Sequence, residues 1–299
     1  MSGDHIKYDE ALAVEMNEEW EKQDSAASGL VNQGAEDFFT GEKNKFPDLK
    51  KAFIEKKKYV CCMDEGTAHM KMEGKLCMAG SGILYPASSY EDRLQKVAEI
   101  YIRKEINNIT SHDGCGAADI AWKALKDSER KKLSVQGIKT PDEYGKKWAE
   151  DLKETVNMIL RKEMKKSIVW HDHITEKEMV RPKEFHNARV VWFDCTGKFD
   201  PAKLGERIPK GFVIDNSEGA KYDKTKDSQE YPFAELAVAI KIALGDHGLN
   251  DKFSKSPFTI VIVAPSVEVL ENMKQKITGR LPADKKDKIK VDGFVEPKK

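Results

Sequence analysis

Short apolar runs that alternate with amphipathic helical patterns constrain the fold of this chain most. Residues 59–63 are a continuous apolar run, and residues 75–79 are a second that begins with Lys75, as expected for strands that are buried on both faces of a parallel sheet. After the second run, Ser88 or Ser89 can cap a helix whose apolar residues fall on one face. Strands that alternate with helices indicate an α/β fold with a mostly parallel sheet flanked by helices.

The same alternation continues along the chain, although no internal repeat is visible in the sequence. It predicts further strands at residues 106–110, 188–193, 211–214 and 258–264, with a weak one near Ile289. It predicts further helices at residues 115–125, 141–166, 233–244 and 267–277.

The first 50 residues are polar and helix-prone, and we interpret them as an N-terminal helical arm. Ser, Gly and Asn accumulate at residues 24–34, which predicts a loop there. The arm is either a frayed terminus or a helix that packs on a partner subunit. We therefore divide the chain into the arm (1–50), a zinc-binding core (51–199) and a C-terminal α/β extension (200–299).

Composition argues against several classes of partner. Lys and Arg number 51, as do Asp and Glu, so no long-range field favours nucleic acid or an anionic membrane. No apolar stretch reaches the roughly 18 residues that span a bilayer, and the start of the sequence has no signal-peptide pattern. We expect a cytoplasmic protein that acts on a small molecule, with no nucleic-acid or membrane partner.

The cysteines and one histidine point to a metal site. Five cysteines cannot all pair with one another, and a reducing compartment favours metal binding or burial. Cys62 ends one predicted strand, whereas His112 and Cys115 follow another, and such ends meet at one edge of a parallel sheet. Zinc prefers thiolate and imidazole ligands, and catalytic sites keep one position open for water. The sequence therefore predicts Zn²⁺ on Cys62, His112 and Cys115, with water or Asp64 in the fourth position.

Each candidate zinc ligand also has a simpler explanation that involves no metal. Cys62 and Cys115 could be small buried side chains, which we expect of Cys61, Cys77 and Cys195. This alternative is weakened by the nearby histidine.

Other polar residues have secondary roles in this interpretation. His69 could be a proton shuttle, or a loop histidine in solvent. Asp113 could orient His112 through a hydrogen bond, or be an exposed turn carboxylate. His171 and His173, with His186, could form a second metal site, although the first two share a face only on a strand.

The motif set resembles that of a known family. Cys62-Met63-Asp64, followed later by His112-Asp113-Gly114-Cys115-Gly116, is similar to the Cys-x-Asp-x-Arg and His-x-x-Cys-Gly signatures of β-class carbonic anhydrases. The resemblance spans roughly residues 56–125. It implies a β-carbonic-anhydrase-like fold, zinc on Cys62, His112 and Cys115, and Asp64 as the carboxylate that positions the nucleophile. It also implies carbon dioxide hydration by zinc-bound hydroxide, and a homodimer or higher homo-oligomer with sites near a dimer interface.

One departure from the signature affects the expected chemistry. Gly66 stands where the family has arginine, so Asp64 lacks a local cation. Either Arg93, Arg181 or Arg189 replaces it, or Asp64 ligates zinc and closes the site. The alternatives to hydration are therefore zinc-dependent hydrolysis of another small electrophile and a non-catalytic protein with a structural zinc.

Overall fold

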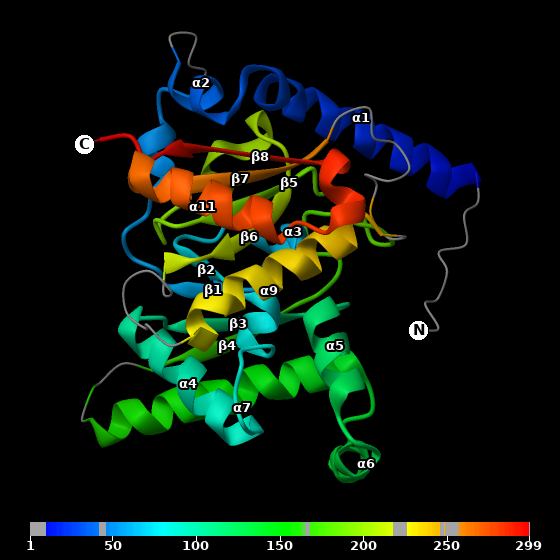
Figure 1. Cartoon of the computed structure of the whole chain (residues 1–299). Helices are drawn as coiled ribbons and strands as arrows, with labels where there is room; N and C mark the ends of the chain where they lie inside the picture. The colour runs from blue at the N-terminus through cyan, green and yellow to red at the C-terminus, as the bar shows by residue number, and fades with distance from the viewer. Residues whose placement is uncertain are drawn as a thin grey trace.

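The computed structural model describes residues 10–41, 46–163, 165, 168–217, 226–245, 248 and 257–298. In this part of the chain, the strands form two four-stranded sheets, and every pairing is parallel. Helices cover the sheets (Figure 1). The predicted α/β fold with parallel sheets and flanking helices is confirmed.

The first sheet has the order β2-β1-β3-β4. Its strands are β1 (Tyr59–Cys61), β2 (Lys75–Cys77), β3 (Asn108–His112) and β4 (Trp170–Ile174). The first three match predicted strands, with β3 two residues later than expected. No strand was predicted at β4, an edge strand that mixes histidine and aspartate with apolar residues. We call β1 to β4 and the helices between them the first unit (residues 59–174).

The second sheet has the order β6-β5-β7-β8. Its strands are β5 (Val190–Asp194), β6 (Gly211–Asp215), β7 (Phe258–Ala264) and β8 (Ile289–Val295). We expected β5 in the zinc-binding core, but it pairs with β6 and β7. We call β5 to β8 and the helices between them the second unit (190–295). The predicted domain boundaries themselves stay predictions.

Helix caps and stripes of apolar residues explain where the main helices of the first unit form. The helices are α3 (Glu65–Ala68), α4 (Tyr90–Arg103), α5 (Gly116–Ala124), α6 (Asp127–Val135) and α7 (Pro141–Lys162), with the 3₁₀ turn η2 (Ala79–Gly82). Ser89 caps α4 as predicted. Thr140 and Glu143 form a capping box that begins α7, which satisfies backbone N–H groups that lack a helical partner. The buried Trp148 and Leu152 then hold α7 in the core.

Helices and 3₁₀ segments also connect the strands of the second unit. Its helices are α9 (Lys226–Ala243) and α11 (Val267–Arg280), with the 3₁₀ segments η3 (Pro201–Arg207) and η4 (Ala283–Lys288); η1 (Leu49–Ala52) precedes β1. No described helix combines the length and apolar character needed to cross a membrane.

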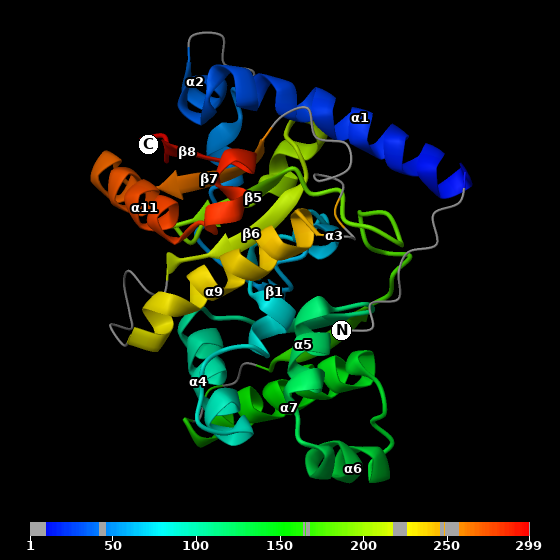
Figure 2. The same cartoon turned by 45° about the vertical axis from the view of Figure 1, so that its right-hand side comes forward.

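The N-terminal arm folds against the second unit as α1 (Glu10–Gln33) and α2 (Ala35–Thr40) (Figure 2). The predicted loop at residues 24–34 is wrong, because α1 runs through most of it. Asp24 accepts a 2.7 Å hydrogen bond from Arg189, whose guanidinium lies over Trp20. Burial of Ala27 and Leu30 adds apolar contact, so tertiary packing overrides the local preference for a loop.

A buried ion pair joins the two units and provides a test of their interface. Lys75 Nζ of β2 lies 3.0 Å from Asp200 Oδ1, which precedes η3, and the side chains are 2% and 0% exposed. Lys75→Met should destabilise the protein by about 3–5 kcal/mol, because it leaves a buried carboxylate without its cation. Urea unfolding measures this loss. The double variant Lys75→Met/Asp200→Asn should lose less than the sum of the single variants; additive losses would contradict coupling across the interface.

Candidate metal centre

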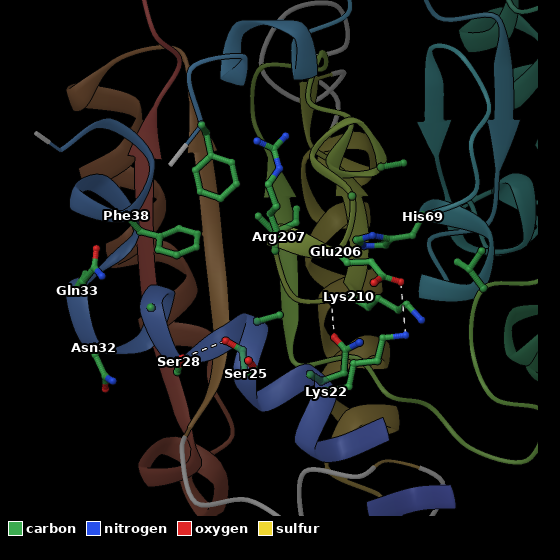
Figure 3. Close-up of a pocket in the computed structure, with 18 of the residues that line it drawn as sticks. Lys22, Ser25, Ser28, Asn32, Gln33, Phe38, His69, Glu206, Arg207 and Lys210 are labelled. Carbon is green, nitrogen blue, oxygen red and sulfur yellow. Dashed lines mark hydrogen bonds and ion pairs between the residues drawn. The ribbon is translucent and has the colours of Figure 1, made fainter. Parts of the chain in front are cut away.

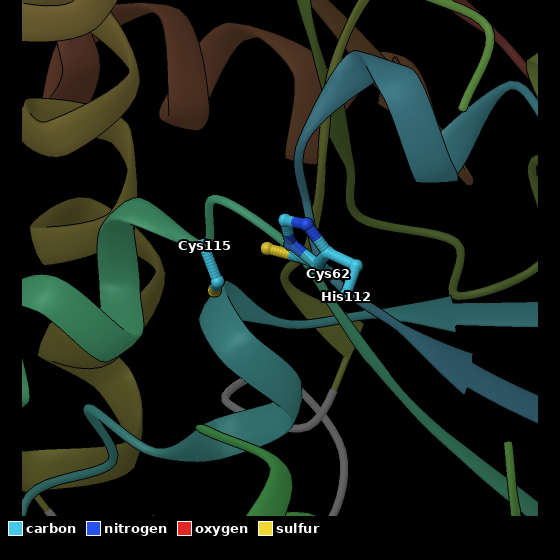
Figure 4. A group of neighbouring side chains, drawn as sticks. All are labelled: Cys62, His112 and Cys115. Atoms are coloured by element: carbon cyan, nitrogen blue, oxygen red, sulfur yellow. The ribbon is translucent and has the colours of Figure 1, made fainter. Parts of the chain in front are cut away.

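The three predicted ligands come together at the C-terminal edge of the first sheet. Cys62 directly follows β1, His112 is the last residue of β3, and Cys115 is the N-cap of α5. Their ligand atoms lie within 4.8 Å of one another, and the side chains face one another (Figure 4). All three are buried. This group can hold a metal ion.

The hydrogen bonding of His112 fits a metal ligand. Its Nδ1 lies 2.8 Å from the Asp113 carbonyl oxygen, so this nitrogen carries the proton and donates it. Nε2 is buried and has no hydrogen-bond partner among the described residues. A buried ring nitrogen without a partner among the described residues, next to two thiols, is the arrangement that a zinc or other thiophilic ion completes.

The two thiols are electrostatically unequal. A hydrogen bond from Cys62 lowers the pKa of Cys115, and the first backbone N–H groups of α5 lower it further, while burial opposes them. The same hydrogen bond, together with burial, raises the pKa of Cys62. Burial disfavours the charged form of His112, yet Cys62 and Asp64 raise its pKa to about 9. Negative charge on sulfur therefore favours a positive charge beside it, which a bound cation would supply in place of the ring proton.

A rigid turn supports Cys62 from the side of β2. Gly80 N–H donates to Cys62 Sγ at 3.2 Å. Gly80 has φ of 51°, and a Cβ there would lie 3.4 Å from Cys115 Sγ and 2.7 Å from Ile83, so glycine is required. Tyr101 and Trp148 each donate a 2.9 Å hydrogen bond to the carbonyl of Ser81 in the same turn.

Asp64 is paired with a cation from a distant segment. Arg181 Nε donates to Asp64 Oδ1 at 3.1 Å, and Gly66 N–H donates to the same oxygen at 2.7 Å. Burial alone would raise the pKa of Asp64, but Arg181, His186 and His112 lower it to about 2. Of the three arginines considered from the sequence, Arg181 is the one that meets Asp64; Arg93 donates to the Tyr85 carbonyl and Arg189 to Asp24.

Gly66 leaves the space through which Arg181 reaches Asp64. A Cβ at position 66 would lie 2.8 Å from Arg181 Cγ and 2.9 Å from Asp64 Oδ1. Val180 N–H donates to the Gly66 carbonyl at 2.9 Å and fixes the incoming segment. The departure from the Cys-x-Asp-x-Arg pattern is thus accompanied by a cation that enters through the space that glycine leaves.

A second buried network surrounds the Asp64 carboxylate. His186 Nδ1 lies 2.9 Å from Glu65 Oε1 and 3.8 Å from Asp64 Oδ2. Asn187 N–H also donates to Glu65 at 3.1 Å. The ligand atoms of Asp64, Glu65 and His186 are close enough to hold a cation. In this geometry Arg181 and a protonated His186 can balance the two carboxylates.

The main-chain carbonyl of Asp113 accepts the hydrogen bond from His112, and its side chain belongs to another cluster. Its carboxylate lies 2.9 Å from His173 Nε2, whose Nδ1 lies 2.8 Å from Ser111 Oγ. Ser111 Oγ also lies 2.9 Å from His171 Nε2, and Glu150 lies 2.7 Å from His171 Nδ1. The two histidines share a face of strand β4, as the strand alternative requires, and Ser111 joins them. His186 lies instead with Asp64 and Glu65.

Ser111 Oγ lies between the two rings, and the carboxylates of Asp113 and Glu150 lie at their far nitrogens. The cluster secures the loop that carries His112 and Cys115.

His69 lies away from the ligand group. Its Nε2 is 3.1 Å from the backbone N and O of Gly211, and burial, with Lys75 and Lys210, lowers its pKa to about 3. It lines a cavity of about 920 Å³ bounded by α1 and the second unit, which none of the three candidate ligands lines (Figure 3). The shuttle role of His69 stays a prediction, and a ring with this pKa is neutral near pH 7.

The remaining cysteines are buried, as expected. Cys61 and Cys77 are paired in register on adjacent strands, with their sulfurs 3.2 Å apart. They pack in a different apolar cluster from Cys62, on the opposite side of β1. Cys195 directly follows β5 in the second unit.

Comparison with known proteins finds no matching family model, no matching curated protein and no matching solved structure.

The sequence patterns did not predict the roles of three polar residues close to this centre, although His186 was considered for a separate metal site. Glu65 and His186 support Asp64, and Glu235 of α9 accepts a hydrogen bond from Ala79 N–H. Glu235 had a recognisable signal, since it is the one acidic residue in the apolar stretch 233–244. Such a buried acid needs a specific partner.

Replacement of one predicted ligand tests the metal centre. Cys115→Ser should remove most bound metal and lower stability, because metal binding contributes folding free energy. Metal analysis by mass spectrometry measures the first effect and thermal unfolding the second. Cys195→Ser is a matched control that alters a buried thiol at a strand end of the second unit, and it should keep full metal. Full occupancy in Cys115→Ser would refute the ligand assignment.

Proposed function

We propose that this chain is a zinc-dependent enzyme that hydrates carbon dioxide to bicarbonate. The observation that carries the proposal is the Asp64–Arg181 pair beside the Cys62, His112 and Cys115 group. Two thiolates and one imidazole are a ligand set that catalytic zinc uses, with one position left for water. Zinc held there would lower the pKa of a bound water towards about 7 and supply hydroxide at neutral pH.

Asp64 is suited to position the nucleophile. Its Oδ1 is occupied by Gly66 and Arg181, whereas, within the described part of the chain, His186 lies 3.8 Å from Oδ2. Because its pKa is lowered to about 2, the carboxylate is ionised throughout the neutral range and accepts hydrogen bonds only. It can thus accept the nucleophile's proton in a hydrogen bond and orient a lone pair towards carbon dioxide.

The same pairing argues against a closed structural site. Asp64 is not among the three residues whose ligand atoms lie within 4.8 Å of one another. Its Oδ1 is held by the buried Arg181, whose side chain is 6% exposed. The pair therefore favours an Asp64 that stays turned towards Arg181 and a fourth position open to exchange.

Carbon dioxide hydration followed by stopped flow tests the activity. The rate should rise as pH increases from about 6.5 to 9, since hydroxide forms as bound water ionises near pH 7. Asp64 should add no acidic limb in this range, because its pKa is about 2. A zinc-loaded protein without hydration activity would exclude this function and favour hydrolysis of another electrophile or a structural metal.

The role of the ion pair has its own test. Arg181→Met should raise the pKa of Asp64 and free its carboxylate, so that kcat falls by about 100-fold while zinc stays bound. Gly66→Ala should act in the same direction by displacing Arg181. Arg93→Met is the control, because Arg93 binds the Tyr85 carbonyl. Unchanged kcat in Arg181→Met would show that Asp64 needs no cation.

A further inference from the structure

The two units repeat one topology that is not visible in the sequence. If the strands of each unit are numbered 1 to 4 along the chain, both sheets have the strand order 2-1-3-4. Among the described residues the connections correspond as well: a short helical segment lies between the first two strands, and a long helix, α4 or α9, lies between the second and the third. One or more helices then lead to the fourth strand.

The units meet as two subunits of a symmetric dimer would. Their corresponding edge strands, β2 and β6, are neighbours across the junction (Figure 1). Contacts run in both directions: α9 reaches the turn after β2 through Glu235 and Ala79, and Lys104 at the end of α4 donates to Ser217 after β6. Reciprocal contacts between equivalent elements define an isologous interface.

Among the residues that the structure describes, only the first unit has the ligand group. β3 ends in His112, whereas β7 ends in Ala264. The N-cap of α5 is Cys115, whereas that of α11 is Ser266. The second unit keeps the frame of the first and offers no imidazole or thiol at these two positions.

Glu235 is the contact through which the second unit reaches the metal centre. It is 2% exposed, and its Oε1 accepts from Ala79 N–H at 2.5 Å. The next amide, Gly80 N–H, donates to Cys62 Sγ. Burial raises the pKa of Glu235 to about 8, so at neutral pH the side chain is mostly a neutral acid that a glutamine can mimic.

We infer that the second unit is a built-in partner subunit, and that Glu235 is a positioning residue that holds the turn at residues 79–82 so that Gly80 N–H meets the Cys62 ligand. The inference rests on the metal site of the proposed function, but not on the reaction catalysed there. One chain then supplies both halves of the interface. It follows that the protein is a monomer with one complete site, in place of the homo-oligomer implied by the family resemblance.

Metal affinity in the full-length chain tests the role of Glu235. Competition for Zn²⁺ with a chromophoric chelator should show about tenfold or greater weakening in Glu235→Leu, the size of effect expected when a group that supports a ligand is lost. Glu235→Gln should restore near-wild-type affinity, because its amide oxygen can accept from Ala79 N–H. A merely structural role predicts no such rescue.

Lys104→Met is the matched control, since it removes the reciprocal contact at the unit without the ligand group. It should keep wild-type zinc affinity even if it lowers thermal stability. Wild-type affinity in Glu235→Leu, or equal weakening in Lys104→Met, would overturn the positioning role.

Sedimentation equilibrium supplies a second readout that needs no metal. The chain should remain a monomer at micromolar protein concentrations. It should also be a monomer in the zinc-loaded protein, with one zinc per chain. A stable homodimer would overturn the built-in partner. Zinc binding by a monomer that hydrates no carbon dioxide would refute only the proposed function.

Discussion

A buried carboxylate beside two thiols needs a cation, and the centre of this protein is arranged to provide one. Asp64 and Arg181 are both nearly inaccessible to water, and an isolated charge in such a place would be strongly unfavourable. Arg181 lies on the segment between β4 and β5, so the pair depends on how the chain leaves the first unit. Gly66 leaves the space, and the Val180 backbone contact fixes the approach.

Local sequence signals predicted most secondary structure and the ligand group. Continuous apolar runs identified β1, β2, β5, β6 and β7, because buried parallel strands need no alternation. Cys62, His112 and Cys115 could be grouped because strand ends of a parallel sheet share one edge. The errors came from tertiary contacts: α1 continues through Asp24 because Arg189 binds it, and β4 is a polar edge strand that pairs only with β3.

The partners of the ligand group were harder to predict, because they come from far along the chain. Arg181 was one of three arginines that the sequence could not rank. Glu65 and His186 meet only when the segment after β4 folds back over α3. Glu235 reaches Ala79 across the junction of the units, and nothing in a sequence without visible repeats indicates that the two units share a topology.

The most direct test of the account is zinc X-ray absorption spectroscopy on the full-length protein, with and without iodide. We predict two sulfur ligands at about 2.3 Å, one imidazole nitrogen and one light atom near 2.0–2.1 Å, with iodide replacing the light atom because Arg181 holds Asp64 away from the metal. A zinc shell that iodide leaves unchanged, or one with a ligand set other than two sulfurs and one imidazole, would contradict an open site formed by Cys62, His112 and Cys115.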